Sequence, residues 1–390
     1  TILEAKMTHE PWSKRHKTTF KGVSYSLSNS FAQPLTSEEL IDLSLKRGDN
    51  EIVAAYYKHS LEYTPNGGSE DLREEISKLY GPNINAENVI VFTGAQVALQ
   101  TAAMALVGNG GCHSIVFTPG YQSVQEAPLH VGSEVTKIRL RPENDWQIQI
   151  NEVEQALRDN TKYIVVNEPH NPTGTVMQKE TRQQLKEIAE KRGICILSDE
   201  VYRLLEHEEK DQFPAMADFY SRGLSCVTLS KPWGGCGITI GWIALQDLDL
   251  KQKLWNVQYF GTACPSRASE IQAIMVLRAS DVILAKNLKI IRHNKSLVQT
   301  FLSNYHQYFE WTPPVSGAIA FVKFKGPLTS EELGEQLAAA GISVKPAYCF
   351  GADLIANGCR DYDDYFRIGF GEEIMPKALE ALARFVEEHK

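Results

Sequence analysis

Short runs of β-branched and aliphatic residues recur through the middle of the chain, and helical segments such as 179–192 separate several of them. The runs are Val89–Phe92, Ser114–Thr118, Thr161–Asn167, Ile194–Ser198, Cys226–Leu229 and Ile240–Leu245. Strands that are apolar on both faces are typical of a parallel sheet covered by helices. The sequence therefore predicts an α/β fold with a mostly parallel sheet, and a ligand at the carboxyl ends of its strands.

The flanking regions predict a smaller second domain, as a length of 390 residues also suggests. After residue 266 the pattern is largely helical to about 308, where Pro313-Pro314 interrupts it before short strands and helices resume. We predict an N-terminal arm with part of the small domain over 1–50, a large domain over 51–285 and a small α+β domain over 286–390.

Charge and hydropathy narrow the classes of partner. The chain has 40 basic and 48 acidic side chains, a net charge of −8. This balance argues against a general nucleic-acid or anionic-membrane binder. No apolar run approaches the ~18 residues of a membrane span. We expect a small-molecule substrate, with neither nucleic acid nor membrane as a partner.

The cysteines indicate a reducing compartment. An odd number with no C-x-x-C pair does not resemble a disulfide framework or a metal site, and the polar N-terminus has no apolar region of a signal peptide. We predict reduced thiols in a cytoplasmic protein, and no metal site. The seven positions are Cys112, Cys195, Cys226, Cys236, Cys264, Cys349 and Cys359.

The stretch 227–235 places Lys231 directly after an apolar run and before Pro and paired Gly. A lysine that loses water at the mouth of a sheet can lose its proton and condense with an aldehyde to form a Schiff base. Pyridoxal 5′-phosphate (PLP) is the cofactor that uses such a lysine. Alone, such a stretch is far more often a solvated lysine after a strand.

Two further strand ends accompany this lysine. Asn167–Gly174 and Ser198–Tyr202 each follow a predicted strand, and Ser230-Lys231 comes about one strand and one crossover helix later. Because parallel strands point their carboxyl ends at one edge, the three segments are expected to meet there.

With these motifs together, the chain resembles the fold-type I PLP enzymes of the class I/II aminotransferase family, from about Tyr63 to Phe370. The resemblance implies an aspartate aminotransferase-like fold with a seven-stranded sheet in a PLP-binding large domain. It implies that Lys231 holds PLP as an internal aldimine and later moves the proton at the substrate Cα. Asp199 would pair with the pyridine nitrogen, although an Asp after a strand is also a common helix N-cap.

The resemblance also assigns cofactor contacts. Tyr202 and Asn171 would hydrogen-bond the ring oxygen and tune the aldimine nitrogen, which makes Tyr202 a catalytic candidate and Asn171 also a substrate-binding one. Tyr121 would stack on the ring. The phosphate would lie at the helix start after Gly94-Ala95-Gln96, near the Thr228 hydroxyl. Tyr63 resembles the tyrosine that a neighbouring subunit lends to the phosphate, which implies a homodimer with shared sites.

Arg367 matches the family arginine that binds the substrate α-carboxylate through two parallel hydrogen bonds. One position departs from the family pattern. Thr239 stands in Gly237–Gly241, where an arginine commonly neutralises the phosphate. Our hypothesis is that Thr239 donates a neutral hydrogen bond to the phosphate instead.

The resemblance leaves the reaction open. Transamination of a free L-amino acid, through an external aldimine and loss of the Cα proton, is the simplest interpretation. The alternative is a cyclase of the capreomycidine or enduracididine type, which eliminates a hydroxyl group from an arginine derivative and closes the ring, because Leu140–Asn144 and Pro169–Pro172 resemble the former. An acidic arm would suit such a cation, and Glu10 is the candidate. Ligand sensors also carry this fold, but no DNA-binding pattern precedes Tyr63.

Overall fold

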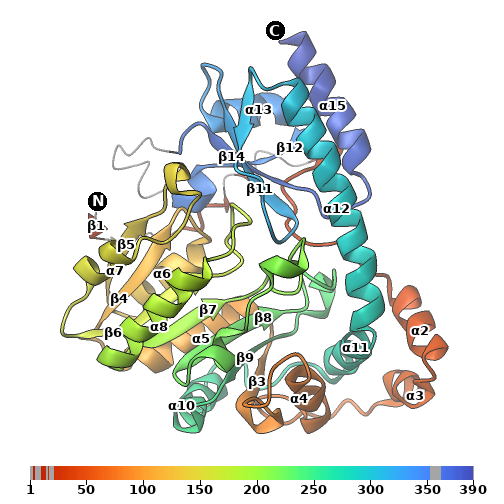
Figure 1. Cartoon of the computed structure of the whole chain (residues 1–390). Coiled ribbons are helices and arrows are strands. Elements are labelled where there is room, and N and C mark those ends of the chain that lie inside the picture. Colours follow the sequence, from red (N-terminus) through yellow and green to blue (C-terminus); the bar gives the residue numbers. More distant parts are fainter. Residues whose placement is uncertain (1–2, 5–9, 15, 17–21, 352–361, 390) are drawn as a thin grey trace.

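The computed structural model describes residues 3–4, 10–14, 16, 22–351 and 362–389. Phe20 in the predicted arm and Cys359 lie outside these residues. Figure 1 shows a large sheet with helices around it, and a smaller group of strands and helices at one end.

The large sheet has the strand order β1-β5-β4-β6-β7-β8-β9-β3. Strands β5, β4, β6, β7 and β8 are mutually parallel, whereas β1, β9 and β3 each pair antiparallel with their neighbours. The bounds are β1 Leu3–Glu4, β3 Val89–Phe92, β4 His113–Thr118, β5 Glu134–Arg139, β6 Thr161–Asn167, β7 Cys195–Asp199, β8 Gly223–Thr228 and β9 Gly241–Leu245.

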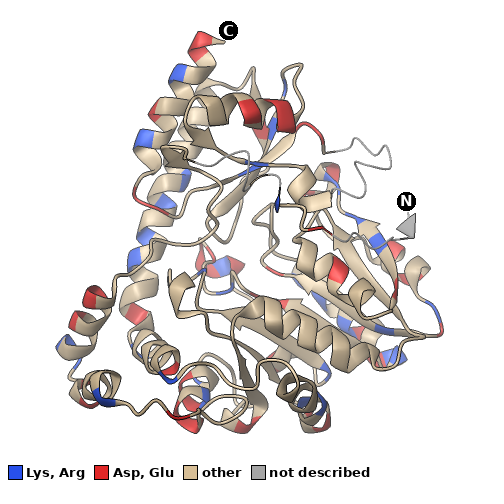
Figure 2. Ribbon diagram, turned by 180° about the vertical axis from the view of Figure 1, so that it is seen from behind, with Lys and Arg blue, Asp and Glu red and all other residues tan. Residues whose placement is uncertain are grey.

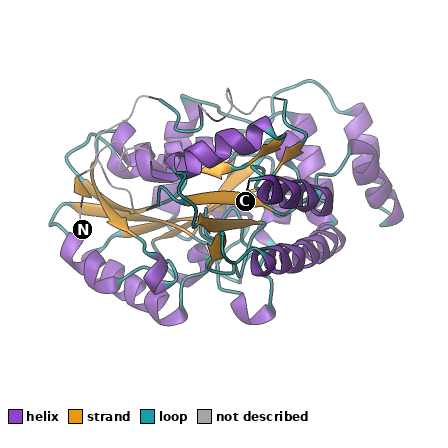
Figure 3. Ribbon diagram, turned by 90° about the horizontal axis from the view of Figure 1, so that it is seen from above, coloured by secondary structure: helices purple, strands orange, loops and turns teal. Residues whose placement is uncertain are grey.

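Helices cover both faces of this sheet (Figure 3). Ile164 and Ile196 pack with one cluster that includes Leu185 of helix α8, whereas the adjacent Val165 and Leu197 pack with the α5 cluster on the other face. This two-sided burial is why the strands are continuously apolar. The helices are α2 Ser37–Lys46, α3 Asn50–Lys58, α4 Glu70–Ser77, α5 Ala95–Val107, α6 Gln122–His130, α7 Ile150–Ala156, α8 Lys179–Arg192, α9 Met216–Phe219, α10 Leu248–Tyr259 and α11 Arg267–Arg278.

The smaller group is built on a four-stranded antiparallel sheet, ordered β10-β11-β14-β13. Helix α12 runs from α11 to α15 and joins it to the rest of the chain (Figure 1). The elements of this smaller group are β10 Phe309–Trp311, β11 Ile319–Phe324, β13 Lys345–Pro346, β14 Tyr365–Gly369, α12 Ser280–Asn304, α13 Ser330–Ala339 and α15 Met375–Glu388.

The N-terminal segment crosses from the small sheet to the large one. Strand β2 (Tyr25–Ser26) pairs with β12 (Ile342–Ser343), the Gly369 amide donates to Leu27 O at 2.7 Å, and Ala32 N donates to Lys231 O at 3.0 Å. Within the predicted arm, residues 25–32 therefore pack against distant parts of the chain. These contacts carry the arm to the strand edge where the predicted site lies.

The predicted α/β class and mostly parallel sheet are confirmed, with three differences. The seven strands β3–β9 are joined by an eighth, β1. Strand β5 was not predicted, because apolar and polar residues alternate in its sequence, Glu134–Arg139. It lies near the edge of the sheet. Strand β9 follows β8 without a crossover helix and pairs antiparallel with it. The domain limits stay a prediction.

Charged residues of both signs are interspersed over the outer helices (Figure 2). Within the part of the chain that the structure describes, no helix is long and apolar enough to cross a membrane. The six described cysteines are free.

Helix α12 offers a matched pair of substitutions for testing this packing. Ile291 is 0% exposed in the small-sheet core, whereas Val282 on the same helix is 43% exposed. Ile291→Ala leaves a cavity and should lower the free energy of unfolding by about 2–5 kcal/mol. Val282→Ala should change it by less than about 0.5 kcal/mol. Urea unfolding measures both, and equal losses would contradict the packing described.

Candidate active site

A cavity of about 370 Å³ lies at the carboxyl ends of the central strands. It brings together most of the predicted site residues, which come from the ends of β3, β4, β6, β7 and β8, from the segments that follow these strands, and from β14. These residues are Gly94, Ala95, Gln96, Tyr121, Asn171, Asp199, Tyr202, Thr228, Lys231, Thr239 and Arg367. A larger groove of about 1140 Å³ beside α8 contains none of them.

Lys231 lies just beyond the end of β8. Its Nζ donates to Ser30 Oγ at 3.0 Å and lies 6.0 Å from the centre of the Phe31 ring, both on the N-terminal arm. Burial and the Arg367 cation lower the pKa of Lys231 to about 8, although Cys236 and Asp199 oppose the shift. A lysine in this state is partly neutral near neutral pH and can act as a nucleophile.

Asp199 ends β7 and is only 2% exposed. Its Oδ1 has no hydrogen-bond partner among the described residues. Burial raises the pKa of this carboxyl to about 7, although the Val201 amide and the Lys231 ammonium oppose the shift. A buried acceptor without a donor fits the protonated ring nitrogen of PLP.

Arg367 and Asn171 also line the cavity, and they contact each other. Arg367 Nη1 donates to Asn171 Oδ1 at 2.9 Å, and Nη2 donates to Ser28 O at 2.7 Å. The buried Nε of Arg367 lacks a hydrogen-bond partner in the described part of the chain. Asn171 is in turn fixed by its amide, which donates to Asn167 Oδ1 at 2.7 Å. Tyr202 lies beside them, and burial raises the pKa of its phenol.

The start of α5 forms an anion cradle. Gly94 precedes the helix with φ 94°, a conformation that glycine adopts without strain, so the helix amides open toward the cavity. Gly241 packs so closely that an added Cβ would lie 2.8 Å from Ala95 N. The Thr228 and Ser230 hydroxyls lie 3.1 Å apart at the same end. These donors fit a phosphate.

Thr239 lies at this end of the cavity with an exposed side chain and φ 58°. Its Oγ1 donates to Gly237 O at 3.4 Å, a long contact. The cations that line the cavity are Lys231, Lys345 and Arg367, among the residues the structure describes.

Two predicted residues lie outside this cavity. Tyr63 is 96% exposed. Glu10 lines a neighbouring cavity of about 600 Å³, where its carboxylate pairs with Lys14 at 3.0 Å. The two cavities share Gln96, Tyr121 and Lys345, so the second cavity continues from the first. Gln96 Nε2 donates to the Tyr121 hydroxyl at 2.6 Å between them.

Sequence reasoning missed several lining residues, among them Ser30, Ser230, Cys236 and Lys345. Ser230 and Cys236 flank the lysine and were within reach of a local search. Ser30 and Lys345 come from distant segments, and no local pattern marks them.

A partly neutral lysine, a buried carboxylate, an anion cradle and a buried arginine around one cavity define a class: PLP-dependent enzymes of fold type I. The sequence profile of the family described as Aminotransferase class I and II matches residues 38–384. The chain belongs to this family, and membership implies PLP as its cofactor.

Known relatives are consistent with this class. A probable aspartate aminotransferase from Methanocaldococcus jannaschii is 30% identical over 62% of this chain and 66% of its own length, just under two thirds. Capreomycidine synthase from Streptomyces vinaceus is 28% identical over 83% of this chain and 80% of its own. A PLP-dependent aminotransferase from Streptococcus suis superposes with a TM-score of 0.89, 26% identity and 99% coverage of both chains.

The lowered pKa of Lys231 predicts its reactivity without cofactor. Below about pH 8 the amine is mostly protonated and reacts slowly, so acylation of Lys231 should rise as the pH passes through about 8. Trace labelling of the cofactor-free protein with acetic anhydride from pH 6 to 11, with mass spectrometry of the Lys231 peptide, measures the midpoint. The exposed Lys14 serves as the internal reference, and a Lys231 midpoint near 10.5 would contradict the description.

Proposed function

We propose that the protein is a PLP-dependent enzyme that acts on a free L-amino acid by removing its Cα proton, and most simply an aminotransferase. The observation that carries this proposal is the meeting of Lys231, Asp199 and Arg367 around one cavity of about 370 Å³. When bound, PLP supplies an aldehyde that condenses with amines and a ring that accepts electrons from the deprotonated carbon.

In this proposal the chain's own residues hold the cofactor. Lys231 provides the amine for the covalent link, and Asp199 Oδ1 accepts from the ring nitrogen and keeps it protonated. Tyr202 and Asn171 hydrogen-bond the ring oxygen, and Tyr121 stacks on the ring. The amides of Gly94, Ala95 and Gln96 and the hydroxyls of Thr228 and Thr239 hold the phosphate.

Arg367 binds the substrate α-carboxylate. Its guanidinium is already oriented by Asn171 Oδ1 and Ser28 O, and its Nε remains to donate. A carboxylate held there fixes the Cα–H bond relative to the cofactor ring. Lys231 would be the base that accepts the Cα proton and the acid that returns a proton in transamination.

We propose a homodimer in which Tyr63 contacts the phosphate of the partner subunit. Large apolar side chains that are strongly exposed in the single chain support this proposal: Tyr57, Leu61, Tyr63, Tyr259 and Phe260. Exposed side chains of this kind are typical of an interface. A cytoplasmic location stays a prediction.

Thr239→Val tests the proposed neutral contact to the phosphate. The two side chains have the same shape and both are β-branched, so backbone strain at φ 58° is matched. Loss of one hydrogen bond should weaken PLP binding about three- to tenfold. Thr239→Ser, which keeps the hydroxyl, is the control. An unchanged dissociation constant for Thr239→Val, by absorbance titration with PLP, would refute this role.

The alternative function is a cyclase that closes a hydroxylated arginine. It is favoured by the similarity to capreomycidine synthase and by the cavity beside Tyr121, which two carboxylates line: Glu10 on the arm and the buried Glu126 on α6. Carboxylates and glutamine amides there would suit a guanidinium that extends from Cα.

The two reactions are separated by incubating PLP-loaded protein with single amino acids, including arginine and hydroxyarginine, and identifying the products. An aminotransferase should release a keto acid and convert the cofactor to pyridoxamine phosphate. A cyclase should form a cyclic amino acid without a keto-acid acceptor, and Glu10→Gln should then raise KM for hydroxyarginine. Lys231→Ala is the inactive control, and no turnover of any amino acid by the wild type would refute the proposal.

A further inference from the structure

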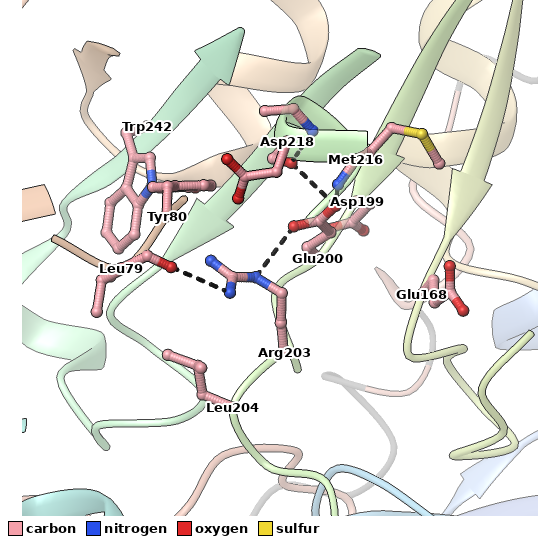
Figure 4. A network of polar contacts seen from close by, with 12 residues as sticks. Leu79, Tyr80, Glu168, Asp199, Glu200, Arg203, Leu204, Met216, Asp218 and Trp242 are labelled. Carbon is pink, nitrogen blue, oxygen red and sulfur yellow. Dashed lines mark hydrogen bonds and ion pairs between the residues drawn. The ribbon is translucent and has the colours of Figure 1, made fainter. Parts of the chain in front are cut away.

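A second buried carboxylate lies directly after Asp199 and faces away from the active cavity. Glu200 is 0% exposed and does not line the cavity, whereas Asp199 and Tyr202 on the same turn do. Figure 4 shows Glu200 beside Arg203, with Tyr80, Trp242 and Met216 around them. None of the roles described above uses these two charged side chains.

Glu200 fastens the turn to the neighbouring strand. Its Oε1 accepts from the Met216 amide at 2.7 Å and from Ser225 Oγ at 2.9 Å, and its own amide donates to Cys226 O at 2.8 Å. Ser225 and Cys226 belong to β8, the strand that leads to Lys231. The carboxylate therefore connects the turn that bears Asp199 to the strand that precedes the lysine.

Arg203 fastens the turn on its other side. Its Nε lies 3.1 Å from Glu200 Oε2, and its Nη1 donates to Leu79 O at 3.4 Å. The guanidinium lies 4.9 Å from the centre of the Tyr80 ring, and the Tyr80 hydroxyl accepts from Trp242 Nε1 at 2.8 Å. Trp242 is buried on β9. The pair thus spans from β8 to β9 and to the segment after α4 (Figure 4).

We propose that Glu200 and Arg203 form a positioning pair, which holds the turn that bears Asp199 and Tyr202 against β8. The opposite charges of the two side chains cancel, so the pair adds no net charge beside Asp199. Neither residue would touch the cofactor or substrate. This inference extends the proposed function, because Asp199 and Tyr202 matter as site residues only if that function is correct. Precise placement of such groups requires support of this kind.

The pair cancels its own charge because the Arg203 guanidinium lies 3.1 Å from the Glu200 carboxylate. The titratable groups that interact electrostatically with the pair are Glu168, Glu206, Tyr80 and Asp199, and those that interact with Asp199 include Lys231, Cys226, Tyr121 and Tyr202. In a buried site an added charge acts strongly on neighbouring ionisations. Loss of the Glu200 charge should favour deprotonation of nearby groups, and loss of the Arg203 charge should favour their protonation.

The test compares Glu200→Gln, Arg203→Gln, the double variant and Arg203→Lys with the wild type. Glu200→Gln keeps an oxygen that can accept from Met216 N and Ser225 Oγ. The matched control is Glu270→Gln on α11: Glu270 is equally buried, accepts from Ser69 N and pairs with Arg267 three positions away, and both partners lie outside the active cavity.

Two pH midpoints are measured for each variant: the absorbance transition of bound PLP, and the acetylation of Lys231 in the cofactor-free protein. Glu200→Gln should lower both midpoints by roughly half a unit or more, and Arg203→Gln should raise them. The double variant should return near the wild-type values, and Glu270→Gln should not move them. A merely structural role would lower thermal stability without shifts of opposite sign.

Arg203→Lys separates position from charge, since a lysine keeps the charge but not the forked contacts. It should keep both midpoints and lower kcat roughly tenfold with little change in KM. The double variant and Arg203→Lys leave no uncompensated buried charge, so they serve if the single neutral variants do not fold. Wild-type midpoints in both single variants, or wild-type kcat in Arg203→Lys, would overturn the proposal. The acetylation midpoint is measured without cofactor, so it tests the positioning pair whether or not the proposed function is correct. Failure of the proposed function itself would appear as a wild type that turns over no amino acid.

Discussion

The buried carboxylate of Asp199 is the feature on which the rest of the site depends. Removing a carboxylate from water is costly unless hydrogen bonds or a counter-charge compensate, yet its Oδ1 has no partner among the residues described. The raised pKa, about 7, reflects that cost. A cationic N–H donor beside Asp199 would remove this cost, and the protonated ring nitrogen of the cofactor would be such a donor. The cavity is therefore complementary to a group that the chain itself does not provide.

The fold holds this carboxylate where three strand ends meet. Strands β6, β7 and β8 are adjacent and parallel, so Asn171, Asp199 and Lys231 arrive at one edge. Buried ion pairs lie behind two of these ends: Glu168 with Arg182, and Glu200 with Arg203. In the proposed function the groups for chemistry at Cα lie at these strand ends, whereas the carboxylates proposed to bind a guanidinium line the neighbouring cavity.

Much of this arrangement was predictable from local sequence. The apolar runs predict the strands, and the residues that follow them predict the edge where Asp199 and Lys231 meet, because parallel order fixes which ends are neighbours. Long-range contacts were not predictable. Ser30 lies beside Lys231 although 201 positions separate them, and Lys345 enters the cavity through the pairing of β13 with β14. The contacts of Glu200 with Met216 on α9 and Ser225 on β8 were also not predictable, since only folding brings these residues together.

The most direct test of the account is to locate the cofactor's covalent attachment. The PLP-loaded protein is reduced with borohydride, digested and mapped by mass spectrometry, with the Asp199→Ala variant treated in parallel. The account predicts one reduced pyridoxyl group on Lys231 in the wild type, and weaker loading of the same lysine in the variant. Attachment mainly at Lys345, the other lysine that lines the cavity, or loading unaffected by loss of Asp199, would contradict it.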